Sequence, residues 1–305
     1  MTTFILRRLV QSVFVMLGVS LVAFMLVHLS GDPIKLMLPF DASPEQISQT
    51  RAYWGLDDPL PMQYGRFIAR VVRGDLGTSM KHSQPVDKLI GERLRATTEL
   101  AVLAMLFALA VAIPVGVFSA IRPYSVWDNL ATVLALSGRS MPVFWLGLLL
   151  ILIFAVQLGW VPPSGRGDWR QLALPSVTLG TAAMATLTRL TRSSLLDEMG
   201  QDYLRTARAK GLAERVVVYA HGLRNAWIPI ITVAGLQFAT LLGGALVTES
   251  VFAWPGLGLL TVRAIYDRDL PLIQGATLFF ATVFVAMNLL VDVLYAFLDP
   301  RIRRQ

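Results

Sequence analysis

Charged residues are absent from six long stretches of this 305-residue chain. Each stretch holds 18 to 26 residues without Asp, Glu, Lys or Arg, about the length that a helix needs to cross a bilayer. A segment inside hydrocarbon must satisfy its own backbone hydrogen bonds, and these stretches lack the period-two alternation of barrel strands. The pattern predicts an all-α polytopic membrane protein with six transmembrane helices. The uncharged stretches are residues 9–31, 100–121, 140–165, 171–188, 225–248 and 270–291.

The composition agrees with this prediction. Hydrophobic residues make up 55% of the chain and charged residues 15%, against about 25% charged residues in an average soluble domain. There is no cysteine and there are three histidines, so thiol chemistry is excluded and we expect no metal or cofactor in this chain. A signal peptide is an alternative for the first stretch, but its apolar region exceeds the usual length of about 7–15 residues and no A-x-A-like site follows.

The distribution of charge predicts the orientation. With Arg139 and Asp292 placed at the membrane edge, the side of the two termini carries 14 basic and 7 acidic residues, and the other side 13 of each. Because short cytoplasmic loops are rich in Lys and Arg, both termini are predicted to be cytoplasmic. The net charge of +7 then belongs to membrane orientation, and we expect no nucleic-acid partner. A specific ion pair between Arg139 and Asp292 is an alternative to separate places at the edge.

The same pattern divides the chain into three parts. Residues 1–95 are expected to form the first transmembrane helix and a periplasmic cap of short helices, residues 96–298 a five-helix core, and residues 299–305 a cytoplasmic tail. The stretch at 172–188 is rich in small residues, which favours a place among other helices over contact with lipid. The predicted core spans are 100–121, 130–158, 172–188, 228–248 and 270–291.

Short amphipathic helices are predicted in the outer segment. Ser43 is followed by a proline at the first helical position and by Gln46 at the capping-box position. Apolar residues then recur at helical spacing over 64–72 and over 86–94, each time after a proline. We expect these stripes to pack on one another and on the membrane domain; a surface for a partner is the alternative.

The loop between the fourth and fifth spans is basic, helix-prone and divided by glycines. Gly200, Gly211 and Gly222 recur at a spacing of 11 residues, which predicts short helices separated by breaks. In residues 202–211 an acid stands at the start and a lysine near the end, in agreement with the helix dipole. Small side chains in the middle would let this helix enter a partner's groove, with basic side chains at the rim. The small residues are Thr206, Ala207 and Ala209, and the basic residues are Arg205, Arg208 and Lys210.

A solvated helix in a positively charged loop is the alternative to docking. If the helix docks, Ala207→Trp should block docking by steric overlap. Gly211 is expected to adopt a positive φ, so Gly211→Val should misdirect the chain after the helix. Arg192→Ala, upstream in the same loop, is expected to be mild.

At these residues the sequence resembles a known family. Residues 202–211, followed by His221–Ile230, resemble the cytoplasmic loop of type I ABC importer permeases, in the branch of dipeptide, oligopeptide and nickel transporters. Further motifs of that branch run nearly from end to end of the chain. They are Gly31-Asp32-Pro33, Gly55-Leu56-Asp57-Asp58-Pro59-Leu60, Gly74-Asp75-Leu76-Gly77-Thr78-Ser79, Glu249-Ser250-Val251-Phe252-Ala253-Trp254-Pro255-Gly256-Leu257-Gly258, and Asp292 followed by Asp299-Pro300-Arg301-Ile302-Arg303.

The resemblance implies a function and a set of partners. A permease of this kind lies in the bacterial inner membrane and imports di- or oligopeptides, or alternatively a nickel chelate or glutathione, delivered by an extracytoplasmic solute-binding protein. It pairs with a second, homologous permease and two ATPase subunits, which bind the ATP and Mg. The loop helix would be the coupling helix that docks on an ATPase. Its residues would be Asp202, Tyr203, Arg205, Thr206, Ala207, Arg208, Ala209, Lys210 and Gly211.

The loop departs from the wider family pattern of E-A-A, three residues, G, nine residues and I-x-L-P. Arg205 and Thr206 stand where that pattern has its first two residues, and only Ala207, Gly211 and Leu223 fit. The R-T-A sequence is characteristic of the peptide and nickel branch, so the departure favours that branch. It also makes the details of ATPase contact less transferable.

Other functions fit the sequence less well. There is no G-x-x-x-x-G-K-[ST] phosphate loop, so the chain itself is not expected to bind or hydrolyse ATP. An intramembrane enzyme would need a histidine base at the depth of its nucleophile, but His28, His82 and His221 all fall at or beyond span ends. A secondary transporter would place ionisable groups near the membrane midplane, where all six stretches are uncharged. No catalytic or substrate-binding residue is assigned from the sequence.

Overall fold

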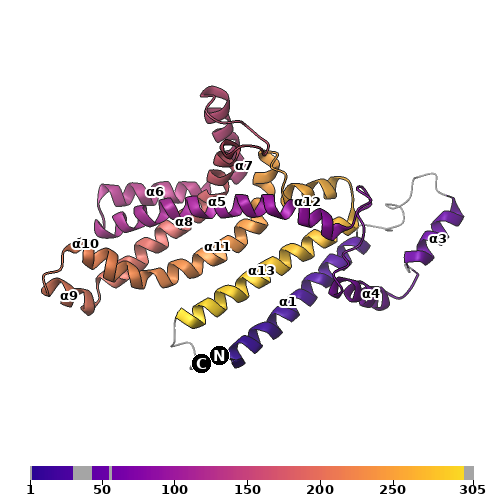
Figure 1. The fold of residues 1–305 in the computed structure, drawn as a ribbon, viewed down its shortest axis with the longest axis horizontal. Coiled ribbons are helices and arrows are strands. Elements are labelled where there is room, and N and C mark those ends of the chain that lie inside the picture. The colour runs from indigo at the N-terminus through magenta and orange to yellow at the C-terminus, as the bar shows by residue number, and fades with distance from the viewer. Residues whose placement is uncertain (1, 30–42, 55–56, 299–305) are drawn as a thin grey trace.

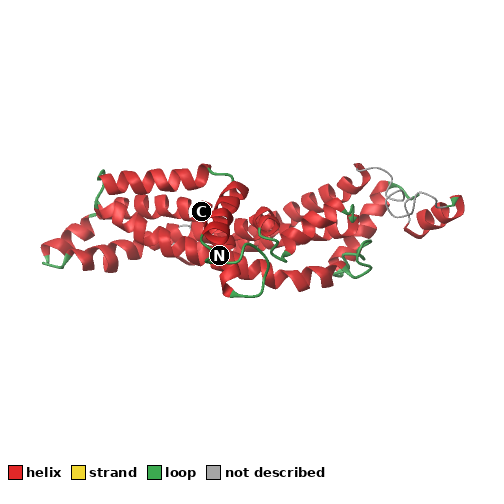
Figure 2. Ribbon diagram, turned by 90° about the horizontal axis from the view of Figure 1, so that it is seen from above, coloured by secondary structure: helices red, strands yellow, loops and turns green. Residues whose placement is uncertain are grey.

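The computed structural model describes residues 2–29, 43–54 and 57–298. Within these ranges the regular elements are helices (Figure 2), apart from one isolated bridge between Thr78 and Pro85, so the all-α prediction is confirmed. The predicted tail and the motifs at Gly31–Pro33 and Asp299–Arg303 lie outside the described residues. The helices are α1 (Thr2–Leu29), α3 (Pro44–Trp54), α4 (Leu60–Val72), α5 (Val86–Ile121), α6 (Val126–Ser140), α7 (Val143–Leu150), η1 (Ile151–Gln157), α8 (Trp169–Met199), α9 (Asp202–Ala209), α10 (Glu214–Val216), η2 (Val217–Gly222), α11 (Leu223–Val251), α12 (Leu257–Tyr266) and α13 (Leu270–Leu298).

Helices α5, α8 and α11 form the main core. Small side chains let α5 and α8 approach closely: a Cβ atom at Gly180 would lie only 2.5 Å from the Ala104 carbonyl oxygen. Alanines of α5 pack with Leu179 and Leu187 of α8, and Trp254 belongs to the same buried cluster. The predicted interior position of 172–188 is therefore correct, because most of this stretch is buried or half-buried in α8, which packs along α5.

Four helices in the described ranges are long and apolar enough to cross a membrane. They are Ile5–Leu26, Val86–Ile121, Glu214–Gly243 and Leu270–Val293. Two further apolar helical stretches, Val143–Gln157 and Leu257–Tyr266, are shorter. The prediction of a polytopic membrane protein is confirmed at this level, and the count of six spans stays a prediction.

The predicted span at 130–158 is not one helix. It is divided at Met141 and Pro142 into α6 and a second helix formed by α7 and η1. Pro142 has no N–H to donate, and it forces the residue before it into an extended conformation, which Met141 adopts at φ −76° and ψ 131°. Figure 1 shows α7 leaving the direction of α5, α6 and α8.

Two features predicted for the cap are present in the described residues. Ser43 and Gln46 form the expected capping box, with Gln46 N donating to Ser43 Oγ and Ser43 N donating to Gln46 Oε1. Helix α4 packs on α1 through Phe67, whose ring centroid lies 5.8 Å from that of Phe24. The predicted helix at 86–94 differs, because these residues are the first turns of α5 and the helix continues unbroken through residue 95.

Helix α12 was not predicted from the sequence. Its apolar face packs on the first turns of α5 and the start of α13, as shown by the buried cluster of Val86, Leu257 and Leu272. At the other end of α13, Asp292 pairs with Arg8 of α1 at 3.2 Å. Asp292 therefore has Arg8 as a partner, whereas the sequence suggested Arg139. The side chain of Arg139 is outside the part of the chain that the structure describes.

Candidate functional site

The predicted docking segment lies at one end of the bundle. Figure 1 places α9 and α10 together there, opposite the end that carries α4 and α12. Helix α9 is held between the end of α8 and the π-helical segment η2, which leads into α11. A force applied to α9 therefore acts directly on two helices of the main core.

One side of α9 is buried against the protein itself. Leu204 is fully buried, Ala207 is 8% exposed, and both pack with Val217 and Met199. Ala207 thus lies on the buried side of the helix, and its contact with a partner stays a prediction. Leu204 is the only large aliphatic residue of the helix, and its i, i+3 spacing to Ala207 is the sequence signal for this buried side.

The opposite side of α9 faces solvent. Asp202, Arg205, Thr206 and Ala209 are all exposed and follow the i, i+3, i+4, i+7 spacing of one helix face. We call these four residues the outward stripe. Arg205 Nη1 lies 3.3 Å from Asp202 Oδ1, and this pair leaves both side chains open to water. A small alanine at the end of the stripe permits close approach of another surface.

Tyr203 ties α9 to both neighbouring helices. Its hydroxyl donates to Glu198 of α8 and accepts a hydrogen bond from Asn225 Nδ2 of α11 at 3.0 Å. Burial raises the pKa of Tyr203 to about 12, and the hydrogen bond to the Glu198 carboxylate adds to the rise. The hydroxyl stays protonated at neutral pH, so it keeps both hydrogen bonds.

The end of α9 is shaped by an ion pair and a glycine. Arg208 donates from Nη2 and Nε to the Glu214 carboxylate, at 2.9 and 3.1 Å, so it is engaged within the loop. Gly211 has a φ of +80°, as expected from the sequence, and a Cβ atom there would meet nothing within 4 Å. The reason for glycine is therefore the backbone conformation alone. Lys210, between them, is exposed.

A buried ion pair that sequence reasoning missed fixes α6 to α8 near this end. Arg192 Nε and Nη2 donate to the two carboxylate oxygens of Asp128 at 2.6 and 2.7 Å, and the Asp128 side chain is only 3% exposed. The Arg192 guanidinium holds the pKa of Asp128 below its usual value, and Tyr124 N adds a further hydrogen bond. Arg192→Ala would leave a buried carboxylate without its cation, so from the structure we expect a larger effect than the sequence predicted.

The described residues contain no group of three or more His, Asp or Glu side chains that could hold a metal ion. What the inner end offers instead is a short helix with one buried side, one exposed stripe and direct connections to α8 and α11. The docking role of this helix stays a prediction.

Comparison with known families identifies the chain. Residues 112–304 match the family described as binding-protein-dependent transport system inner membrane component, and residues 1–101 match the N-terminal region of such membrane components. The chain belongs to this family. It is the permease subunit of a binding-protein-dependent ABC importer, and ATP hydrolysis belongs to a separate subunit.

Individual relatives match over their full length. The permease is 44% identical over 304 residues to the glutathione transport system permease protein GsiC of Salmonella paratyphi A, covering 99% of each chain. It is 43% identical over 338 residues to the dipeptide transport system permease protein DppB of Escherichia coli K12, covering 100% of each. These matches confirm the family predicted from the loop motifs.

A solved structure shares the fold. The inward-facing MetNI methionine ABC transporter matches with a TM-score of 0.52 and 23% identity, over 71% of this chain and 95% of that one. At this identity the match supports the fold and no finer statement. The permease is therefore a multi-pass protein of the bacterial inner membrane whose importer includes an ATPase and a binding protein.

Proposed function

We propose that this permease imports small peptides, either dipeptides or the tripeptide glutathione. The observation that carries the proposal is the full-length identity of 43–44% to permeases named for dipeptide and glutathione transport. The import of a nickel chelate has no comparable support from these relatives. The permease forms the membrane path together with a second, homologous permease, and two ATPase subunits supply the energy.

In this proposal the outward stripe of α9 docks in a groove on an ATPase subunit. Asp202, Arg205, Thr206 and Ala209 supply the contact surface, while the buried side, through Leu204, transmits movement to η2. Tyr203 couples the same movement to α8 and α11 through Glu198 and Asn225. The result is alternating access of the core to the two sides of the membrane, without covalent chemistry in this chain.

The topology of the proposal has six spans with both termini in the cytoplasm. Two of the spans would be α8 and the pair formed by α6 and α7 with η1, in addition to the four helices of membrane length. The close approach of α1 and α13, with Arg8 and Asp292 paired, supports a common side for the two chain ends.

An uptake experiment tests the proposed function. The permease is reconstituted into liposomes with its second permease, its two ATPase subunits and its binding protein, and uptake of radiolabelled alanyl-alanine and glutathione is measured with ATP. We expect ATP-dependent uptake of at least one of them and none of a nickel chelate. Uptake of the nickel chelate alone, or of no solute, would contradict the proposal.

Single cysteines test the orientation, because the chain has none of its own. Ser83 and Gln201 are both exposed and lie at opposite ends of the bundle. Ser83→Cys should react with an impermeant thiol reagent in whole cells whose outer membrane has been permeabilised, and Gln201→Cys only after the inner membrane is opened. The reverse labelling pattern would overturn the orientation.

A further inference from the structure

The outer half of α5 borders a cavity that the coupling function does not use. The cavity has a volume of about 670 Å³, within the range of about 300–1,000 Å³ that is typical of small-molecule sites. One wall is apolar, formed by Leu94, Val102, Leu103 and Leu172, and charged residues stand beside it. Because α5 begins at Val86, directly after the outer segment, the cavity lies toward the side from which a solute arrives in the proposed topology.

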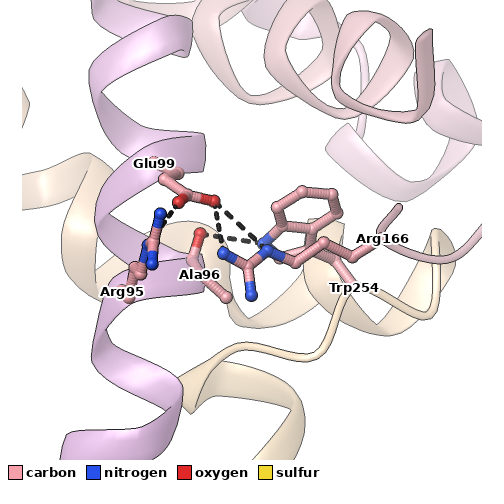
Figure 3. Close-up of polar contacts among 5 residues, drawn as sticks. All are labelled: Arg95, Ala96, Glu99, Arg166 and Trp254. Carbon is pink, nitrogen blue, oxygen red and sulfur yellow. Dashed lines mark hydrogen bonds and ion pairs between the residues drawn. The ribbon is translucent and has the colours of Figure 1, made fainter. Parts of the chain in front are cut away.

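Arg95 and Glu99 line this cavity, and Arg166 reaches Glu99 from a neighbouring loop (Figure 3). The Glu99 carboxylate accepts hydrogen bonds from Arg95 Nε at 2.9 Å and from Arg166 Nη2 and Nε at 2.6 and 3.2 Å. One carboxylate thus faces two guanidinium groups, which leaves one positive charge uncompensated within the cluster. A carboxylate has about four acceptor positions, so Glu99 keeps one for a further donor.

Arg166 and Glu99 are held in place: Glu99 by the two arginines, and Arg166 by Glu99 and by an aromatic ring. The Arg166 guanidinium lies over the ring of Trp254, 5.6 Å from its centroid, and Trp254 is fully buried with its Nε1 donating to the Ala96 carbonyl oxygen at 2.8 Å (Figure 3). Arg95 differs, because its side chain is 83% exposed and pairs with Glu99, one helical turn away. An exposed pair of this kind contributes little free energy, so Arg95 can exchange Glu99 for another carboxylate.

We infer that this cavity is a binding site for a zwitterionic peptide, with Glu99 receiving the terminal ammonium group and Arg95 and Arg166 the terminal carboxylate. The apolar wall accepts the peptide's side chains. The inference rests on the proposed function, since free peptides carry both terminal charges. A purely structural cluster, which would only fasten the loop carrying Arg166 to α5, is the alternative.

A thiol-protection experiment tests the site in the complete importer. Leu103→Cys puts the one cysteine of this chain into the cavity wall, at a position that is 38% exposed and open to a reagent. We measure the concentration of alanyl-alanine that halves labelling of this chain, and compare N-acetyl-alanyl-alanine and alanyl-alanine amide. Each blocked peptide should need a concentration higher by about tenfold or more, because it lacks one charge-assisted contact.

Second substitutions assign the contacts. With Glu99→Gln, the free and N-acetylated peptides should protect equally. With Arg95→Gln, the difference between the free and amidated peptides should become smaller, because Arg166 alone then binds the carboxylate. Glu92→Gln is the matched control, an exposed glutamate on the same helix outside the cavity, and should keep the wild-type ratios. Wild-type protection by all three peptides at equal concentrations, or equal losses for all three in Glu99→Gln, would overturn the inference.

Uptake by the wild-type importer separates the two proposals. If peptides are imported but the protection ratios do not change in the variants, the site is wrong and the proposed function stands. If no peptide is imported, the proposed function fails and the site fails with it.

Discussion

Two groups of polar side chains, at opposite ends of the helical bundle, differ in their exposure to water. At the end that carries α12, the side chains of Glu249, Thr97 and Trp254 are at most 1% exposed. Thr97 is hydrogen-bonded to Glu249, and Trp254 to the carbonyl oxygen of Ala96. At the inner end, the Arg205 and Asp202 side chains of α9 form a pair while remaining 73% and 93% exposed. The first group connects separate helices and is closed to water, whereas the second lies within one helix and is open to water.

The outer group acts as a fixed joint between α5, α11 and α12. Thr97 Oγ1 donates to Glu249 Oε1 at 2.6 Å and accepts from Leu257 N at 2.8 Å, while Leu259 N donates to Glu249 Oε2 at 2.9 Å. The Glu249 carboxylate thereby satisfies free N–H groups in the first turn of α12. A Cβ atom at Gly256 would overlap this carboxylate, so the motif needs a glycine there.

The inner end shows why a docking surface is built differently. Exposed ion pairs contribute only about 0–1 kcal/mol, so the outward stripe can rearrange against a partner at small cost. Buried polar groups cannot rearrange in this way. Separating a buried hydrogen-bonded pair leaves each group without a partner, which costs about 1–3 kcal/mol per group. The contrast indicates a rigid outer joint and an adaptable inner contact, joined by α5, α8 and α11.

The largest effect is expected from Trp254→Ala at the outer joint. This change removes a fully buried ring and its hydrogen bond to Ala96, and should lower the free energy of unfolding by about 3–5 kcal/mol. Thermal unfolding of the purified permease in detergent measures it. Trp169→Ala is the control, since that ring is 72% exposed and its loss should have little effect. Equal melting temperatures for the two variants would refute the rigid joint.

A smaller loss is expected from Arg192→Ala, which breaks the partly exposed pair with Asp128. Arg192 is 26% exposed, so we expect about 3 kcal/mol, the low end for breaking a buried pair. Arg215→Ala serves as control, because Arg215 is an exposed arginine in the same inner loop. If both variants unfold at the same temperature, the pair does not fasten α6 to α8.

Ala207 and Ala209 form a matched pair on the two sides of α9. Ala207→Trp overpacks the buried side and should destabilise the inner loop by about 1–3 kcal/mol, seen as faster proteolysis of the loop. Ala209→Trp lies on the outward stripe and should leave proteolysis unchanged while reducing capture of the ATPase subunits in a pull-down. Normal capture by Ala209→Trp would show that the stripe is solvent-facing only.

The smallest effect is expected at Gly211. A side chain at φ +80° costs about 1–2 kcal/mol for Val, whereas Asn tolerates this region better. Gly211→Val should therefore reduce substrate-stimulated ATP hydrolysis in the reconstituted importer, and Gly211→Asn should reduce it less. Equal activity of the two variants would show that the backbone turn does not matter for coupling.

Much of this molecule could be predicted from the sequence alone, because the relevant signals are local. Long uncharged stretches predict membrane helices, the Ser43 and Gln46 pattern predicts a capped helix, and the position of Gly211 after a short basic helix predicts a positive φ. The family also follows from contiguous motifs. Each of these properties depends on residues within a few turns of one another.

The tertiary structure determined which distant segments bury one another's side chains and which polar and charged groups pair. Arg192 meets Asp128 across 64 residues of sequence, and Thr97 meets Glu249 across 152. The buried side of α9 depends likewise on Val217 of η2, which is why Ala207 lies inside and Ala209 outside. Helical periodicity tells which residues share a face, but only packing against another segment determines which face is covered.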